Sequence, residues 1–199
     1  MQLYGRLSNL MWELTLGITT NGIAGEDTWT SEHIHYGTVG YSTIHQVLDY
    51  LKLKPADVFV DLGCGKGRVL CCAARFGIRE AVGVEDSEEL VTIARRNAEH
   101  LRGKLSPIRL VRQKAQEAEY DSGTVFYLFH PFGPKTLDEV LHRIRQSINP
   151  EKPAVRIAYV NPVHNEVFQD HRWLEEYERW DNRHRPRVEH PVSYWRSRG

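Results

Sequence analysis

A glycine-rich loop follows a short apolar run in the first half of the chain. Residues 58–70 read VFVDLGCGKGRVL, so Asp61 stands two residues before Gly63, and Gly65 follows two residues later. Glycines in such a loop let the backbone approach a ligand closely and allow positive φ angles. The N-terminus of the helix that should follow favours a negatively charged group. The pattern therefore predicts a ligand at this turn, although a tight turn without a ligand would use the same glycines.

A second acid, Glu85, ends the next expected strand, where a carboxylate can accept both hydroxyls of a ribose. The glycines are spaced G-x-G-x-G, which differs from the G-x-G-x-x-G of dinucleotide sites. S-adenosylmethionine carries a ribose diol, an α-amino group that needs acceptors and an α-carboxylate that needs N–H donors. The two acids and the glycine loop offer these partners, so the sequence favours S-adenosylmethionine, with a nucleotide-binding Rossmann domain as the alternative.

The stretch D-L-G-C-G-K-G-R, followed by G-V-E-D-S-E-E-L and A-R-R-N, resembles the Rossmann-like (class I) S-adenosylmethionine-dependent methyltransferase family over about residues 55–160. The resemblance implies an α/β fold with a doubly wound, mostly parallel seven-stranded sheet whose last strand is antiparallel. It implies S-adenosylmethionine as the methyl donor and S-adenosylhomocysteine as the product. The methionine part would lie on the glycine loop, and the ribose and adenine would lie near the second strand. The residues implied in this site are Asp61, Gly63, Cys64, Gly65, Glu85 and Asp86.

One position departs from the family pattern after the third expected strand. The family usually has an acid there that contacts the adenine amino group, whereas this chain reads Arg112-Gln113-Lys114-Ala115. Lysine offers no acceptor, so a backbone carbonyl or Gln113 would take that role if Lys114 and Ala115 border the adenine. The alternative is that Lys114 is an exposed surface residue.

The acceptor side is expected where the fourth and fifth strands end. Amino-directed members of the family often carry Asn/Asp-Pro-Pro-Tyr/Phe after the fourth strand, and this chain has His130-Pro131-Phe132. Because His130 replaces the amide or acid, nitrogen methylation does not carry over directly. A histidine can remove a proton from an acceptor near neutral pH, or it can simply hydrogen-bond the loop. Phe132 could wall the pocket, and Asn161 and His164 are further candidate acceptor contacts.

The segment before the core holds two aromatic candidates, Tyr36 and Tyr41. The resemblance implies that such a segment closes over the cofactor and that an aromatic residue meets its carboxylate end. His33 and His35 are two residues apart and would point to opposite sides of a strand, so we predict no metal site.

Expected strands and helices alternate through the middle of the chain, which predicts a parallel sheet with helices on both faces. Ser42 and an Asp86–Glu89 capping box are the expected helix starts there. We predict one domain, with an N-terminal helical or lid segment (1–54), a cofactor-binding core (55–160) and a C-terminal helix and antiparallel hairpin (161–199). The expected strands are 58–61, 81–85, 108–112, 124–129, 155–160, 174–180 and 191–198, and the expected helices are a short N-terminal one, 43–52, 68–76, 87–102 and 137–148.

Composition and net charge limit the kinds of partner that we expect this protein to bind. The 199 residues have a formal net charge of zero, so no global field attracts nucleic acid or an anionic membrane. No run is long and apolar enough for a membrane span, and the three cysteines fit reduced, buried thiols, which favours the cytoplasm. Arginines and aromatic residues after Arg172 could contact nucleic acid, but acids are interleaved with them.

These observations predict a methyltransferase whose acceptor is a small molecule or a protein. Two alternatives remain open from the sequence: a module that binds S-adenosylmethionine without transferring its methyl group, and a nucleic-acid methyltransferase that uses the C-terminal arginines. The sequence does not indicate an oligomeric state.

Overall fold

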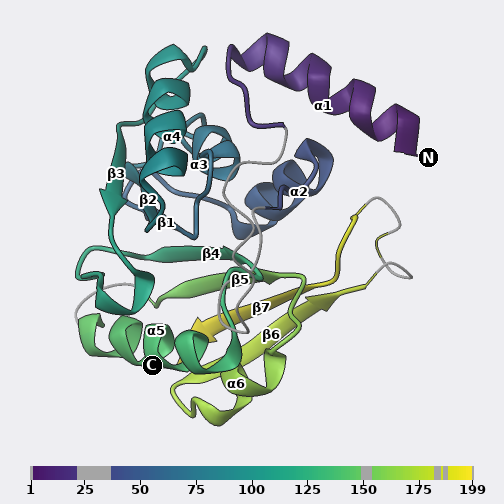
Figure 1. The fold of residues 1–199 in the computed structure, drawn as a ribbon. Helices are drawn as coiled ribbons and strands as arrows, with labels where there is room; N and C mark the ends of the chain where they lie inside the picture. Colours follow the sequence, from purple (N-terminus) through teal and green to yellow (C-terminus); the bar gives the residue numbers. More distant parts are fainter. Residues whose placement is uncertain (1, 22–36, 149–153, 182–184, 186–187, 199) are drawn as a thin grey trace.

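The computed structural model describes residues 2–21, 37–148, 154–181, 185 and 188–198. Its centre is one seven-stranded sheet in the order β3-β2-β1-β4-β5-β7-β6, in which β7 runs antiparallel to both of its neighbours (Figure 1). This confirms the mostly parallel sheet with a C-terminal antiparallel hairpin. The strands are β1 (Val58–Leu62), β2 (Glu80–Glu85), β3 (Ile108–Arg112), β4 (Val125–Phe129), β5 (Arg156–Val160), β6 (Leu174–Trp180) and β7 (Val192–Ser197).

Helices cover both faces of the sheet, as Figure 1 shows. One apolar core lies between the sheet and the side of α2 and α3, and a second lies on the side of α5 and α6. Every residue of β1 is buried because both of its faces are covered. None of the helices in the described ranges is long and apolar enough to cross a bilayer. The helices are α1 (Gln2–Leu16), α2 (Tyr41–Leu51), α3 (Arg68–Ala73), α4 (Glu88–His100), α5 (Pro134–Ser147) and α6 (Asn165–Asp170), with a 3₁₀ turn η1 (Ala115–Glu117).

Three helix starts differ from the sequence-based expectation. Helix α5 begins at Pro134, three residues before the expected start at 137. Helix α2 begins at Tyr41, and its N-cap is Gly40 without a side-chain cap, so Ser42 lies inside the first turn. Helix α4 is capped by Ser87, whose Oγ accepts from the Leu90 N–H at 3.3 Å. The expected capping box placed the N-cap at Asp86, one residue before the observed N-cap, Ser87. Sequence spacing alone could not distinguish these adjacent capping residues.

Candidate functional site

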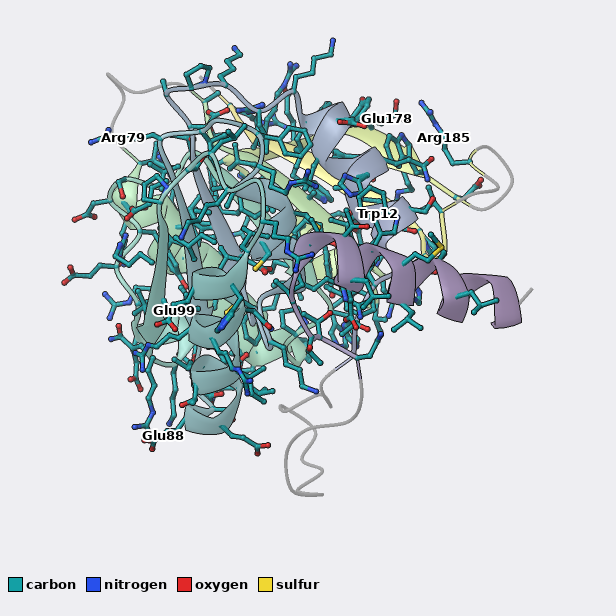
Figure 2. All side chains as sticks on the ribbon, turned by 90° about the horizontal axis from the view of Figure 1, so that it is seen from above. Trp12, Arg79, Glu88, Glu99, Glu178 and Arg185 are labelled. Carbon is teal, nitrogen blue, oxygen red and sulfur yellow. The ribbon has the colours of Figure 1, made fainter. Side chains whose placement is uncertain are left out.

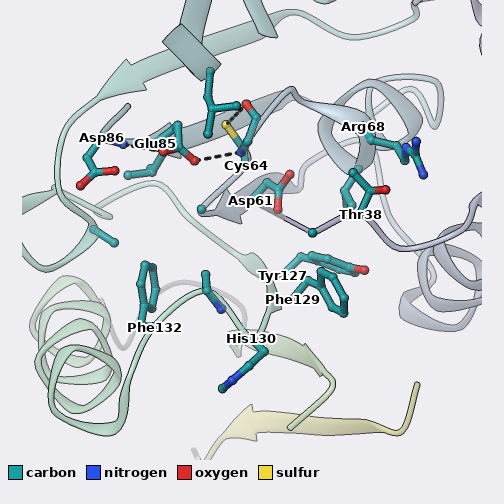
Figure 3. Close-up of a pocket in the computed structure, with 18 of the residues that line it drawn as sticks. Thr38, Asp61, Cys64, Arg68, Glu85, Asp86, Tyr127, Phe129, His130 and Phe132 are labelled. Carbon is teal, nitrogen blue, oxygen red and sulfur yellow. Dashed lines mark hydrogen bonds between the residues drawn. The ribbon is translucent and has the colours of Figure 1, made fainter. Parts of the chain in front are cut away.

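A cavity of about 330 Å³ opens at the carboxyl ends of β1, β2 and β4 (Figure 3). The strand order reverses between β1 and β4, and the loops after these two strands diverge there. Open α/β sheets bind ligands at such a switch point. The loop after β3 and residues 37–39 complete the wall. The position in the fold therefore marks this cavity as the candidate active site.

The glycine loop has the backbone geometry that its sequence suggested. Gly63 has a φ of 70°, in the left-handed region that favours glycine. A Cβ added to Gly63 would lie 2.7 Å from the Cβ of Pro131, which belongs to the loop after β4. Glycine at position 63 thus lets the two loops that bound the cavity meet.

Glu85 fastens the glycine loop to the end of β2. One carboxylate oxygen accepts from the Gly65 N–H at 3.0 Å, and the other accepts from the N–H groups of Asp86 and Ser87, each at 3.1 Å. Burial raises the pKa of Glu85, and the backbone hydrogen bonds from Ser87 and Gly65 oppose that shift. The carboxylate lines the cavity beside Cys64 (Figure 3).

Asp61 and Tyr127 bring two buried polar groups to the cavity wall. Burial, followed by the charge of Glu85, raises the pKa of Asp61 from its ordinary value of 3.8 to about 8. The Tyr127 hydroxyl is buried and has no hydrogen-bond partner among the described residues. S-adenosylmethionine carries an α-ammonium group, whose positive charge would lower the pKa of Asp61 and stabilise its carboxylate form. It also carries polar atoms that could pair with the Tyr127 hydroxyl. The residues present therefore fit this cofactor.

The raised pKa of Asp61 predicts an unusual dependence of stability on pH. Between about pH 4 and pH 8 the folded chain keeps a proton on Asp61 that the unfolded chain has lost. The free energy of unfolding, without added ligand, should therefore fall as the pH rises through this window, by on the order of a few kcal/mol. Urea unfolding at pH 5 and pH 8 measures the change. The Asp61→Asn variant should lose most of it, and an unchanged slope in that variant would contradict the assignment.

Most of the predicted site residues line this one cavity. Whether they contact a bound cofactor or acceptor stays a prediction. Those that line it are Asp61, Gly63, Cys64, Gly65, Glu85, Asp86, Lys114, Ala115, His130, Phe132 and Asn161.

Lys114 is exposed at the rim of the cavity, next to the buried Ala115. The Gln113 side-chain amide donates to the Glu117 carbonyl at 3.1 Å, and the Gln113 N–H donates to the Glu85 carbonyl at 3.0 Å. Gln113 itself lines the cavity. Both interpretations of Lys114, a border of the adenine or a surface residue, remain compatible with this position.

Two further predicted residues, Tyr41 and His164, do not line the cavity. Tyr36 lies outside the described residues. Tyr41 is fully buried at the start of α2, and its ring lies under the Arg68 guanidinium at 4.8 Å. It packs in the core beside Arg68, and its contact with a cofactor stays a prediction. His164 stands behind His130, with ring centroids 5.2 Å apart.

The His130 side chain points away from Cys64 and Asp61 in Figure 3. Its Nδ1 lies 3.2 Å from the hydroxyl of Tyr159, which also accepts from the His164 N–H at 3.4 Å. Burial, and then the neighbouring His164, lower the pKa of His130, so the ring is neutral at pH 7. His130 has a backbone φ of 39° and its ring is held by Tyr159, so it contributes to the shape of this loop. Its role as a base stays a prediction.

Arg68 lines the cavity but was not among the sequence-based candidates. Only 3% of its side chain is exposed, and Nη2 pairs with Glu13 of α1 at 3.3 Å. The guanidinium also donates to Thr20 Oγ1 at 2.6 Å and to the Val39 carbonyl at 3.0 Å. An arginine directly after the glycine loop was visible in the sequence, but its partner lies 55 residues away. The N-terminal segment is thereby attached to the cavity wall.

A group of metal-ligating side chains lies elsewhere, between α5 and the start of β6. Ligand atoms of Asp138, His142 and His171 lie within 4.8 Å of one another. The Trp173 indole N–H donates to His171 Nδ1 at 3.1 Å, and an indole nitrogen can only donate. A neutral His171 therefore carries its proton on Nε2, 2.9 Å from Asp138. A metal ion would need a lone pair on Nε2, but in this tautomer Nε2 carries the proton. The arrangement therefore suits a hydrogen bond that connects α5 to the segment before β6.

The described arginines of the C-terminal hairpin have partners in the chain. Arg179 pairs with Glu176 and Arg196 pairs with Glu175, both on the exposed surface. Arg185 lies over the ring of Trp180 at 4.7 Å. These pairs suit a solvated strand surface and add no support to nucleic-acid contact.

Comparisons with known proteins agree with this site. The family model "Histone methylation protein DOT1" matches residues 28–123, which include the glycine loop and Glu85. A protein-lysine N-methyltransferase of Saccharolobus islandicus is 28% identical over 128 residues, covering 63% of this chain and 75% of that protein. A ribosomal protein L11 methyltransferase of Cupriavidus necator is 29% identical over 98 residues, covering 48% of this chain and 32% of that protein.

The fold has a matching solved structure. An RNA methyltransferase from Salinibacter ruber, crystallised with S-adenosyl-L-homocysteine, aligns with a TM-score of 0.61 at 22% identity. The alignment covers 81% of this chain and 94% of that one. With the sheet order, the glycine loop and the cofactor-compatible acids, these similarities identify the chain as an enzyme of the class I S-adenosylmethionine-dependent methyltransferase family.

Proposed function

We propose that this enzyme transfers a methyl group from S-adenosylmethionine to the side-chain amine of a lysine in a protein. The observation that carries the proposal is the apolar cavity wall made by Phe129 and Phe132 at the end of β4, which suits an uncharged amine. The relative named as a protein-lysine N-methyltransferase and the family model named for histone methylation support this class of acceptor.

The cofactor-side residues hold and orient the donor. Asp61 offers a buried carboxylate, the Tyr127 hydroxyl offers a hydrogen-bonding group, and Glu85 offers acceptor oxygens toward a ribose. When bound, S-adenosylmethionine supplies a methyl group on a sulfonium, already activated for displacement. The enzyme's contribution is then mainly alignment of the acceptor with that methyl group.

The acceptor-side residues must present an uncharged amine. The rings of Phe129 and Phe132 border the cavity (Figure 3), and an apolar wall lowers the pKa of an amine because burial disfavours its charged form. His130 is neutral at pH 7, since burial and His164 lower its pKa, so it adds no positive charge beside the incoming group. The protonated amine can lose its proton to water before it enters.

The direct test is to incubate the enzyme with methyl-labelled S-adenosylmethionine and a mixture of cellular protein, RNA and small molecules. We expect label in the protein fraction and, after acid hydrolysis, in methylated lysine. Chemical blocking of the lysine amines beforehand should remove the signal. Label in RNA or in a small molecule would contradict the proposed acceptor, although not the family.

Phe132 should matter for transfer more than for cofactor binding. It is half-buried in the cavity wall, on the side of the acceptor loop. We expect Phe132→Ala to lower kcat/KM for the protein acceptor by about 10- to 100-fold, because the amine loses part of its apolar wall and its alignment. The dissociation constant for S-adenosylmethionine should stay within about threefold, as read by calorimetry.

Val163→Ala is the matched control for Phe132→Ala. Val163 is apolar and 54% exposed, follows β5 and does not line the cavity. Its kcat/KM should be close to that of the wild type. Equal losses in the two variants would show that the change at Phe132 acts through the general stability of these loops.

A further inference from the structure

Helix α1 has an apolar surface on the side that faces away from the sheet. Leu7, Leu10, Met11 and Leu14 are 49–69% exposed, and we call these four residues the outer stripe. They make up most of the large apolar side chains that are strongly exposed in the described part of the chain. Figure 1 and Figure 2 show α1 at the edge of the molecule beside α2, and in neither view does another drawn helix or strand lie over it.

The opposite side of the same helix is firmly packed. The Trp12 ring stacks on Tyr41 with centroids 5.8 Å apart, Glu13 pairs with Arg68, and Leu16 is buried. A helix on the surface of a domain normally has one apolar face and one polar face. Helix α1 has two apolar faces, and the part of the chain that the structure describes covers only one of them.

The outer stripe belongs to a regular sequence pattern. Leucines stand at positions 3, 7, 10 and 14, with spacings of four, three and four residues. This spacing is the heptad seam along which two helices pack against each other. Met11 follows Leu10 and widens the seam. The pattern fits an apolar helix as its partner.

We propose that the outer stripe is the contact through which two copies of this chain form a dimer, with α1 packed on the α1 of the second copy. The only charged residues of α1 are Arg6 and Glu13, and Glu13 is turned inward to Arg68, so the four residues of the outer stripe carry no charge themselves. A helix that lies on a membrane usually carries several lysines or arginines beside its apolar face, whereas Arg6 is the single one in α1.

The surface area of the outer stripe is small for a contact between two protein copies. Four side chains from each copy bury roughly 800 Å² in total, below the 1,200–2,000 Å² of standard stable interfaces. Flanking side chains such as Ser8 and Thr15, which are exposed, add some contact. We therefore expect a weak dimer that forms only as the protein concentration rises.

Analytical ultracentrifugation of the full chain over a series of concentrations tests the proposal. We expect a reversible shift from monomer to dimer that is insensitive to salt, because the contact is apolar. The double variant Leu10→Gln, Leu14→Gln should remain monomeric throughout, and glutamine is a good helix former. Leu105→Gln, at an apolar residue that is 69% exposed outside α1, should dimerise like the wild type. A wild type that is monomeric at every concentration, or a dimer that persists in the double variant, would overturn the proposal.

Cross-linking gives a second test that does not depend on loss of association. In a two-fold dimer, residues near the middle of the stripe approach their own copies. A Met11→Cys variant should form an intermolecular disulfide under mild oxidation, whereas a Leu105→Cys variant should not. The natural thiols of Cys64, Cys71 and Cys72 are buried, and burial raises the pKa of each, so they do not compete. Equal cross-linking at positions 11 and 105 would argue against a specific contact. Neither test requires knowledge of the methyl acceptor.

Discussion

Replacing Glu85 with alanine is expected to weaken the binding of S-adenosylmethionine by at least about 100-fold. The change removes the acceptor oxygens that face a ribose. It also leaves the N–H groups of Gly65, Asp86 and Ser87 without the carboxylate that now accepts from them. The glycine loop would lose its tie to β2 as well as a ligand contact. Isothermal titration calorimetry with S-adenosylmethionine and S-adenosylhomocysteine measures the effect.

The matched control for this change is Glu88→Ala. Glu88 is an acid three residues further along, it is 73% exposed in an ion pair with Arg112, and it does not line the cavity. Its affinity for both ligands should remain at the wild-type level. A Glu85→Ala variant that melts like the wild type and binds as tightly would refute the assignment of the ribose side to Glu85.

The second large effect is expected from Glu13→Gln, which removes the charge that pairs with Arg68. Both side chains are buried, with 7% and 3% exposed, so the guanidinium would remain in the interior without a carboxylate. Breaking a buried pair in this way costs about 3–5 kcal/mol in the free energy of unfolding. For a chain of this length, Tm should fall by about 10 °C. Thermal and urea unfolding give the two values.

Glu80→Gln provides the comparison at the surface. Glu80 pairs with Arg109 through two hydrogen bonds, and the Arg109 side chain is 51% exposed. Exposed pairs contribute about 0–1 kcal/mol, so this variant should unfold close to the wild type. If both variants lost a similar free energy of unfolding, burial would not be the reason why the Glu13–Arg68 pair stabilises the fold.

The local sequence was enough for the centre of the fold and for the cofactor. Alternating apolar strands and helices predicted the parallel sheet, and the strand 174–180 was predicted with the bounds of β6. Asp61, the glycine loop and Glu85 follow their strands directly, and parallel strands place their carboxyl ends on one edge. Periodicity and spacing are local properties, so one sequence can reveal them.

Contacts between distant segments were beyond the reach of the same argument. Nothing near Arg68 in the sequence indicated Glu13, and nothing near Tyr41 indicated that its ring would pack under the Arg68 guanidinium. The direction of the His130 ring depends on Tyr159 and on a positive φ, neither of which residue type specifies.

The sequence by itself determined the class of fold, the glycine loop and the two acids that suit S-adenosylmethionine, because short-range pattern and strand direction control all three. Only the tertiary structure decided that α1 supports the cavity through Glu13 while it leaves the outer stripe uncovered. The physical reason is that burial and ion pairing depend on which segments meet in space, and segments 55 residues apart carry no local signal of their meeting.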